Sequence, residues 1–402
     1  MKNNSMLIRE NISCKFVLKF AFGFVILFLL NSGCQGRFTS TLVHKGKDVC
    51  INTDILIDSI SFNAERTSCV GFFFMDDSLI CFSDRLYCSL FRFNLNGTFV
   101  DRKFGKGSGP GELPALRKMF NVPGKDYYYS FDQNNMLYQL DKRKWTVKRL
   151  GRIDFGWDKS VQKIGSDYAN CYYFNTLNYP GFVFHEINDS TLIFPVKADH
   201  KKFSGSSVES NANKYYTTGK IFGELNLNSN KVDRLFGFIP EFYQQYEFLS
   251  NFNGFSYDCQ GDTIYVDYAA DSLMHVYKYP DKFLYTIGFS GRDMNQDYKE
   301  TSSYEAAKKQ MREDALIFGR YSCVKYIKET NALLRVYYKG NHSETDGLQV
   351  YKNNDLIADF DVPKHFQVIG FCNGYYYAVK YVPEQTGQEF NLYKFKLEKN
   401  EK

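Results

Sequence analysis

Residues 104–113 are rich enough in glycine to raise the question of phosphate binding, with four glycines and one proline in ten positions. A phosphate-binding loop requires Gly-Lys followed by Ser or Thr, but Lys106 is followed by Gly107. The dinucleotide-binding fingerprint fails as well, because neither Gly105-x-Gly107 nor Gly107-x-Gly109 has another glycine three residues later. Glycine and proline at this density favour a tight connection between two β units.

The cysteines and histidines show no spacing that is typical of a metal site or a catalytic triad. There is no C-x-x-C pair, no zinc-type cluster and no His-Glu-x-x-His motif. We therefore interpret most cysteines as small buried hydrophobes and the histidines as surface residues or hydrogen-bonded core residues. One disulfide would suit an exported chain, but the sequence does not pair its cysteines. The cysteines beyond Cys14 and Cys34 are Cys50, Cys69, Cys81, Cys88, Cys171, Cys259, Cys323 and Cys372.

The N-terminal residues have the order of a secretory signal. Basic residues precede an apolar run at residues 20–30, which ends in the small and polar residues 31–33 before Cys34. A membrane-spanning helix needs about 20 apolar residues, so this run is too short to be one. We expect residues 1–33 to be a signal peptide that is absent from the mature protein.

The residues around Cys34 resemble a bacterial lipobox, in which the cysteine becomes the acylated first residue of the mature protein. The sequence departs from the usual pattern at Asn31, where an aliphatic residue is common, and Leu30 stands one position earlier. Residues 35–37 contain no acidic run, which lipoproteins of Bacteroidota often carry when they are sent to the cell surface. The resemblance predicts a lipid anchor in the outer membrane, facing the periplasm, with residues 34–47 as a tether.

The charge of the chain argues against nucleic acid as a partner. The formal net charge is +5, but residues 1–33 contain four basic residues and one acidic residue, so the mature chain carries +2. Nucleic-acid-binding proteins are expected to show basic patches or stripes. A nearly neutral mature chain therefore favours other partners.

Beyond residue 37 the chain is composed of predicted strands that recur in similar units. Aromatic residues make up 18% of the sequence and occur in runs such as residues 127–129. Such runs suit strands that pack on both faces, and a carbohydrate-binding platform is the alternative. A unit of strand, turn and strand recurs at a period of about 40–50 residues, which is typical of propeller blades. The six units are residues 80–100, 128–151, 220–237, 263–288, 321–360 and 368–397.

Residues 105–113, followed by Asp132-x-Asn134 and residues 136–138, resemble an NHL-type repeat. Together with the lipoprotein signal, the chain resembles the six-bladed β-propeller (NHL/TolB-like) lipoproteins of Bacteroidota, many of which have no known function. The resemblance implies an all-β, six-bladed propeller over residues 48–398. In such propellers a strand from one terminus commonly completes the blade of the other. Residues 48–57 are therefore expected to pair near residues 391–397.

One segment breaks the strand pattern. Ser302 and Glu305 have capping-box spacing, and residues 306–316 are mostly good helix formers. We expect a helical insertion at about residues 293–318, between the fourth and fifth blades. The helix would either cover the mouth of the axial channel or lie elsewhere on the surface without a role at the channel.

Three aspartates, Asp84, Asp132 and Asp267, occupy equivalent places in the repeat, and we expect them at the ends of inner strands. In one interpretation they converge on the axial channel and hold calcium through hard oxygen ligands, as in six-bladed lactonases and gluconolactonase-like hydrolases. In the other, each carboxylate caps a turn by accepting local backbone N–H bonds. Because a single metal site needs different residues from different blades, the recurrence of aspartate favours the turn-capping interpretation. These three residues remain the candidate binding residues.

The sequence therefore predicts a membrane-anchored propeller that binds or scaffolds a partner in the cell envelope. Its partners would be the membrane, through the lipid anchor, and an envelope protein or a glycan. No catalytic motif, metal ligand set or cofactor motif was identified, and a calcium-dependent lactonase with an axial site is the alternative. A fold that is so widely reused does not by itself determine function.

Overall fold

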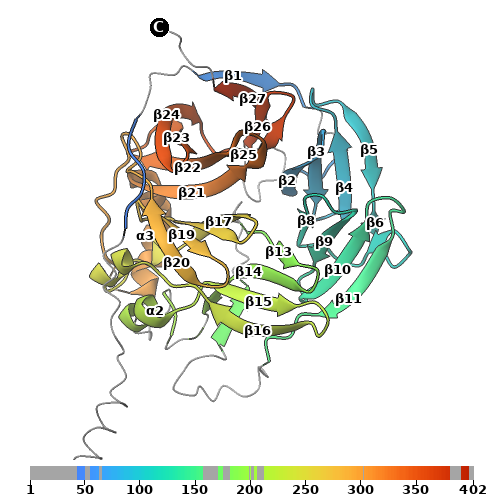
Figure 1. The fold of residues 1–402 in the computed structure, drawn as a ribbon, viewed down its shortest axis with the longest axis horizontal. Helices are drawn as coiled ribbons and strands as arrows, with labels where there is room; N and C mark the ends of the chain where they lie inside the picture. The colour runs from blue at the N-terminus through green and yellow to red at the C-terminus, as the bar shows by residue number, and fades with distance from the viewer. Residues whose placement is uncertain are drawn as a thin grey trace, which may run out of the picture. The chain divides into compact units, whose positions relative to one another are not determined.

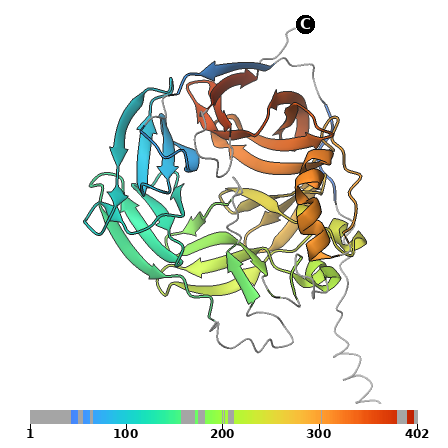
Figure 2. The ribbon, with the colours of Figure 1, turned by 180° about the vertical axis from the view of Figure 1, so that it is seen from behind.

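The structure is a computed structural model, and it describes residues 43–49, 55–62, 66–156, 171–174, 182–198, 200, 203–205, 212–301, 303–380 and 391–397. The predicted signal peptide, Cys34 and Cys50 lie outside these residues. His44–Lys402 forms one compact unit. Its strands form six antiparallel sheets set around a common axis, which is a six-bladed β-propeller (Figures 1 and 2). The predicted fold class is confirmed.

Five of the blades are four-stranded antiparallel sheets. The first comprises β2 (Gly71–Asp76), β3 (Leu79–Asp84), β4 (Ser89–Phe93) and β5 (Phe99–Lys103). The second comprises β8 (Lys118–Asn121), β9 (Tyr127–Phe131), β10 (Met136–Asp141) and β11 (Val147–Arg152). The fourth comprises β17 (Phe255–Gln260), β18 (Thr263–Tyr268), β19 (Met274–Lys278) and β20 (Lys282–Ile287). The fifth comprises β21 (Phe318–Ile327), β22 (Ala332–Gly340), β23 (Thr345–Lys352) and β24 (Asp355–Pro363).

The sixth blade combines strands from both ends of the propeller. It contains β25 (Phe366–Cys372), β26 (Tyr375–Lys380), β27 (Leu392–Leu397) and, on the outside, β1 (Ile55–Ile60). β1 is antiparallel to β27, with Ile55 opposite Leu397 and Ile60 opposite Leu392. The expected closure is therefore present, but the closing strand lies a few residues later than residues 48–57.

The closing strand is shifted because the residues before it pair elsewhere. Lys45 donates its backbone N–H to the carbonyl of Thr286 at 2.8 Å, at the outer strand β20 of the fourth blade. Val49 donates to the carbonyl of Leu356 at 3.0 Å, at the outer strand β24 of the fifth blade. This segment gives partners to two outer strands, whose exposed edges would otherwise offer unpaired backbone groups.

The third blade differs from the others at its inner edge. Its outer part is regular, with β14 (Thr191–Ala198), β15 (Phe222–Asn226) and β16 (Lys231–Phe236). Two short strands, β12 (Tyr172–Phe174) and β13 (His185–Asn188), share the inner edge, and both are antiparallel to β14. The inner strand of this blade is thus interrupted, and the chain returns to it at residues 182–185.

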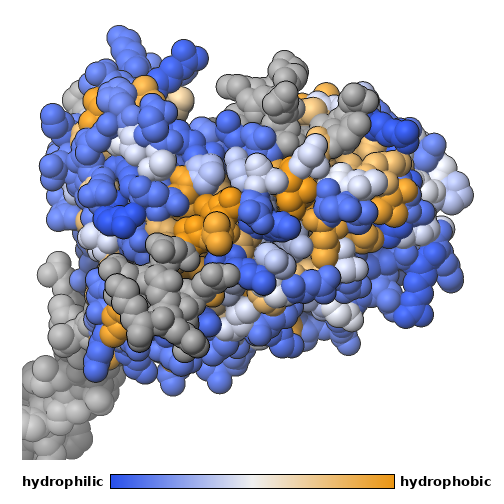
Figure 3. All heavy atoms as spheres, turned by 90° about the horizontal axis from the view of Figure 1, so that it is seen from above, coloured by the Kyte–Doolittle hydropathy of each residue, from blue (hydrophilic) through white to orange (hydrophobic). Residues whose placement is uncertain are grey.

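Aromatic side chains fill the interface between the second and third blades. Phe131 stacks on Phe120 with ring centroids 5.8 Å apart, and Phe184 lies 4.9 Å from Phe120 and 5.2 Å from Phe194. Aromatic pairs in this distance range add to the free energy gained from burial. The residues of the aromatic runs 72–74, 127–129, 172–174 and 375–377 are all buried or half-buried, so they belong to the core and not to an exposed carbohydrate platform. The face seen in Figure 3 is mostly polar, with apolar areas between the polar residues.

The glycine-rich segment connects the first two blades, as predicted. β6 (Gly105–Lys106) pairs with β7 (Glu112–Leu113), and the carboxylate of Glu112 accepts a bond from the Gly109 N–H at 2.8 Å. A Cβ atom on Gly107 would lie 2.1 Å from an oxygen of Glu112. A side chain at position 107 would displace the Glu112 carboxylate from the Gly109 N–H, so this contact accounts for the glycine without invoking a phosphate.

The described helices lie outside the sheets. They are α2 (Ala212–Thr218), α3 (Tyr304–Ile317) and three 3-10 turns at Glu241–Gln245, Ser250–Phe252 and Lys328–Thr330. α3 confirms the predicted helix between the fourth and fifth blades, although its N-cap is Ser303, whose hydroxyl accepts from the Ala306 N–H. α3 packs against Ser250–Phe252, where Asn251 donates to Asp314 at 2.8 Å (Figure 2). No helix in the described part of the chain is long and apolar enough to cross a membrane.

The cysteines agree with their predicted role. Most of the seven in the described residues are buried, and they are Cys69, Cys81, Cys88, Cys171, Cys259, Cys323 and Cys372. They contribute to packing and form no cross-link with one another.

Truncation of the inward-facing side chain of the closing strand should loosen the sixth blade. Ile57 packs against a buried apolar cluster, whereas its neighbour Leu56 is 66% exposed. We expect Ile57→Ala to lower the free energy of unfolding by about 1–2 kcal/mol and Leu56→Ala to change it by less than about 0.5 kcal/mol. Urea denaturation checks both values, and hydrogen exchange should show reduced protection in β26 and β27 for Ile57→Ala alone. Equal effects of the two variants would mean that β1 does not close the ring through this contact.

Candidate functional site

The three predicted aspartates lie on the second strands of their blades, not on the inner strands. Asp84 ends β3, Asp132 directly follows β9 and Asp267 lies near the end of β18, whereas the strands nearest the axis are β2, β8 and β17 (Figure 1). The prediction was wrong on this point because the second strand, buried on both faces, has the most apolar sequence pattern. The inner strand β8 is shorter than β9, and β17 is more polar than β18, so these inner strands are less prominent in the sequence.

Asp84 and Asp132 cap turns. Asp84 accepts from the backbone N–H groups of Ser68 at 2.6 Å and Tyr87 at 2.9 Å. Asp132 accepts from the backbone N–H of Asn134 at 2.7 Å and from the hydroxyl of Tyr138 at 3.2 Å. Short side chains that accept local backbone bonds in this way stabilise turns.

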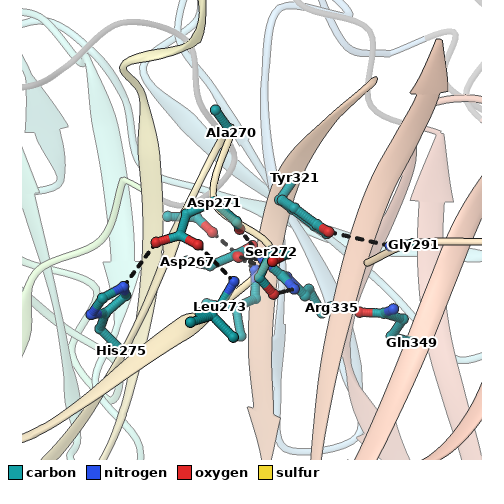
Figure 4. A network of polar contacts seen from close by, with 12 residues as sticks. Asp267, Ala270, Asp271, Ser272, Leu273, His275, Gly291, Tyr321, Arg335 and Gln349 are labelled. Atoms are coloured by element: carbon teal, nitrogen blue, oxygen red, sulfur yellow. Dashed lines mark hydrogen bonds and ion pairs between the residues drawn. The ribbon is translucent and has the colours of Figure 1, made fainter. Parts of the chain in front are cut away.

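Asp267 has a different role, because it forms an ion pair with Arg335 of the next blade (Figure 4). Both side chains are fully buried, and Nε of Arg335 lies 2.7 Å from Oδ1 of Asp267. The guanidinium also donates to the carbonyls of Ser272 at 2.7 Å and Asp271 at 2.8 Å. Its other face lies over the ring of Tyr321, 3.2 Å from the centroid. Arg335 thus joins the fifth blade to the β18–β19 turn of the fourth.

Further buried polar contacts extend this connection between blades. The Asp271 carboxylate accepts from the Leu273 N–H at 2.9 Å and lies 3.0 Å from Nε2 of His275 (Figure 4). Gln349 donates to the carbonyl of Phe289 at 3.2 Å, in the segment that links the two blades. Burial raises the pKa of Asp267 to about 6, and the charge of Arg335 opposes this increase. We call Asp267, Asp271, His275, Arg335 and Gln349 the interblade lock. Groups of the protein itself bond to its two carboxylates.

A second polar set lies on the inner strands and is centred on Asp258 of β17. Its Oδ1 accepts from the Cys259 N–H at 3.0 Å, and its Oδ2 accepts from the Tyr326 N–H at 2.9 Å. Nζ of Lys325, on β21, lies 3.2 Å from Oδ2, and Nε2 of His185, on β13, lies 3.2 Å from Oδ1. Three successive blades therefore contribute to one cluster beside the axis.

The charges within this cluster stabilise one another. Burial would raise the pKa of Asp258, but the charge of Lys325 and the contact with His185 hold it well below its usual range. Burial would lower the pKa of Lys325, but the Asp258 carboxylate raises it above its usual range. Both groups are therefore charged at neutral pH, as expected for a close ion pair.

A second lysine, Lys118, lies on the inner strand of the second blade, which is opposite the fifth blade in the ring. It begins the inner strand β8, and its ammonium group lies 4.3 Å from the ring centroid of Phe72, 5.8 Å from that of Phe120 and 5.9 Å from that of Phe182. Burial lowers the pKa of Lys118 to about 7, and two groups of β21, the Cys323 thiol and the Lys325 ammonium, contribute with opposite signs. The two lysines lie on the inner strands of blades that face each other across the ring. We call Lys118, His185, Asp258 and Lys325 the axial cluster.

Sequence reasoning did not single out any residue of the axial cluster. His185 was grouped with surface or core histidines, and the two lysines were counted only as charge. One signal was available, because Lys118 begins and Lys325 interrupts an apolar strand sequence, where charged residues are rarely buried. The sequence could not show that the blades carrying them face the same axis.

The described residues contain no group of three or more His, Cys, Asp or Glu side chains placed to hold a metal ion. Asp84, Asp132 and Asp267 are therefore not brought together into such a group.

Comparisons with known proteins support the fold. A scan against models of protein families and a search of curated proteins found no match. Among solved structures, a member of the DUF4221 family from Bacteroides vulgatus is similar with a TM-score of 0.59 and 13% identity, over 86% of this chain and 98% of that one. A protein from Bacteroides fragilis, described as a candidate exported protein, has a TM-score of 0.48 and 14% identity, over 89% of this chain and 99% of that one. The first likeness shows a shared propeller fold.

Removal of Arg335 should destabilise the propeller strongly, because it leaves the buried carboxylate of Asp267 without its cation. We expect Arg335→Met to lower the free energy of unfolding by about 3–5 kcal/mol, and the double variant Asp267→Leu/Arg335→Met to recover most of that loss. In Arg335→Met the loss should be smaller at about pH 5 than at about pH 8, since Asp267 can then be protonated. Urea denaturation measures these values, with the exposed Arg312→Met as the control. A single variant as stable as the control would contradict the proposed lock.

Proposed function

We propose that this protein is an exported binding propeller whose ligand site is the axial cluster. The observation that carries the proposal is the meeting of His185, Asp258 and Lys325 from three successive blades, with buried Lys118 on the inner strand of a fourth. The aromatic interface between the second and third blades shows that blades of this protein pack without charged groups. Concave sites with a few converging polar groups and perturbed pKa values are the usual places for ligands.

The burial of Lys118 supports a functional role for the cluster. A lysine with a pKa far below its usual value makes the folded state less stable at neutral pH than an apolar residue of similar shape would. Structures retain such groups where binding or chemistry requires them. The three phenylalanine rings around its ammonium group partly compensate through cation–π attraction.

The cell envelope is the proposed location. The N-terminal sequence order of basic residues, apolar run and small residues before Cys34 supports export and lipid attachment. In this proposal the lipid at Cys34 holds the propeller at the outer membrane on its periplasmic side. An envelope protein or a glycan would then bring the group that the axial cluster binds.

Metal ions should have little effect on the stability of the protein. A ligand that binds only the folded state raises the melting temperature. Because the carboxylates of Asp84, Asp132 and Asp267 are engaged by backbone groups or by Arg335, we expect calcium, zinc and a chelator to leave the melting temperature unchanged. Thermal denaturation checks this, together with an assay of lactone hydrolysis. A calcium-dependent increase that Asp132→Ala abolishes, along with lactone hydrolysis, would instead support a calcium-dependent lactonase.

The mature protein should begin at a lipid-modified Cys34. Mass spectrometry of protein extracted from membranes should find an acylated N-terminal peptide and no peptide from residues 1–33. Cys34→Ser should move the protein from the membrane fraction to the soluble fraction without changing its melting temperature. An unmodified Cys34 peptide that retains upstream residues would contradict the proposed anchor.

A further inference from the structure

The helix α3 is attached to the propeller along one side only. Ala307 is its one buried side chain. Asn251, in the 3-10 turn before β17, donates to the carboxylate of Asp314 at 2.8 Å and to the carbonyl of Ala307 at 3.0 Å. The helix lies in front of the sheets in Figure 2, and its other side chains are exposed or half-buried. Most of its surface is therefore open to a partner.

Large apolar side chains are concentrated on this open surface. Tyr304, Met311 and Leu316 are 38%, 53% and 49% exposed, and they are three of the ten large apolar side chains that are exposed in the described part of the chain. Tyr304 and Met311 lie two turns apart on one face, and Leu316 follows on the adjacent face. Lys308 and Arg312 occupy positions between them. Apolar side chains flanked by basic ones are typical of helices that lie in the interfacial region of a bilayer.

The N-terminal segment joins the propeller on the same side of the ring as α3. Residues 44–49 pair with the outer strands of the fourth and fifth blades, and α3 lies in the connection between these two blades (Figure 1). The ring of His44 contacts that of Phe289, in this same connection, with centroids 5.4 Å apart. His44 is ten positions after Cys34, and a chain of that length spans at most about 35 Å. A lipid at Cys34 would therefore keep the membrane close to this side of the ring.

From these observations, and resting on the lipid anchor proposed above, we propose that α3 lies against the membrane surface and orients the propeller on it. The side chains of Tyr304, Met311 and Leu316 enter the headgroup region, where burial of their apolar surface favours binding. A tether alone would leave the propeller free to turn about it. The second contact fixes the orientation and directs the first and second blades, across the ring from α3, away from the bilayer.

The charges of α3 contribute less than its apolar side chains. Lys308, Lys309 and Arg312 are exposed, but so are Glu305 and Glu313, and the positive charges exceed the negative ones by only one. A basic residue near an anionic membrane surface strengthens binding by about fivefold. We therefore expect anionic lipid to increase the affinity by about this factor and not by orders of magnitude.

Cosedimentation with lipid vesicles tests the proposal. The protein is the mature chain from residue 34 with Cys34→Ser, so that no attached lipid contributes. The contact is too weak to survive the washing of a membrane fraction, so binding is measured at high lipid concentration. The vesicles are phosphatidylethanolamine with phosphatidylglycerol, and phosphatidylcholine for comparison. We expect binding to both, and Met311→Ser/Leu316→Ser should weaken it by about tenfold or more. Leu56→Ser, at a 66% exposed position of β1, should bind as its parent does.

Fluorescence reports whether the helix itself enters the bilayer. In Met311→Trp, vesicles should shift the added emission to shorter wavelength, and brominated lipid should quench it, because the indole ring favours the membrane interface. Leu56→Trp is the matched control and should show neither change.

Three outcomes would overturn the proposal. These are no binding to either kind of vesicle, equal binding by the parent and Met311→Ser/Leu316→Ser, or self-association in solution that the same pair abolishes. The last would assign the surface to a second copy of the chain. Melting temperatures should be unchanged in these variants, because the substituted side chains are exposed. Mass spectrometry of Cys34 tests the anchor separately, so loss of the anchor and loss of the helix contact are distinguishable.

Discussion

Closure of the ring is the constraint on which the rest of the structure depends. Each blade is a small antiparallel sheet with two faces to cover, and only a closed ring covers all of them. The pairing of β1 with β27 provides that closure, because it joins the start of the propeller to its last blade. Residues 44–49 add backbone pairing at the outer strands of the fourth and fifth blades before the chain reaches β1. A single N-terminal segment therefore secures three blades.

The blades are held together by two different kinds of interface. Between the second and third blades the contact is aromatic, with rings such as Phe120, Phe131 and Phe184 in close pairs. Between the fourth and fifth blades it is polar, with Arg335 bonded to Asp267 and to two backbone carbonyls. Aromatic rings can pack in many relative orientations. The guanidinium has donors in fixed directions, so its bonds form in only one relative orientation of the two blades. The polar interface thus fixes the orientation of the fourth and fifth blades relative to each other. It also contacts the inner strand β21, where Arg335 lies over Tyr321.

The axial cluster depends on this support and on the irregular third blade. Lys325 lies on β21, and His185 lies where the interrupted inner strand of the third blade resumes. Phe182, immediately before that strand, contributes a ring to the surroundings of Lys118. An uninterrupted inner strand would continue the backbone ladder at this point. The interruption instead places a histidine and an aromatic ring beside the axis, which connects the irregularity to the proposed site.

The sequence by itself determined the class of fold, the repeated unit, the connection at residues 104–113 and the helix before β21. These features are local, because glycine spacing, strand patterns and helix propensity act over a few residues. It did not determine which strand of each unit is innermost, so Asp84, Asp132 and Asp267 were placed one strand too close to the axis. Nor could it show that Lys118 and Lys325 lie on opposite blades, because they are more than two hundred residues apart. Only the closed ring decides which blades face one another, because that relation depends on the number of blades and on the packing of every interface between them.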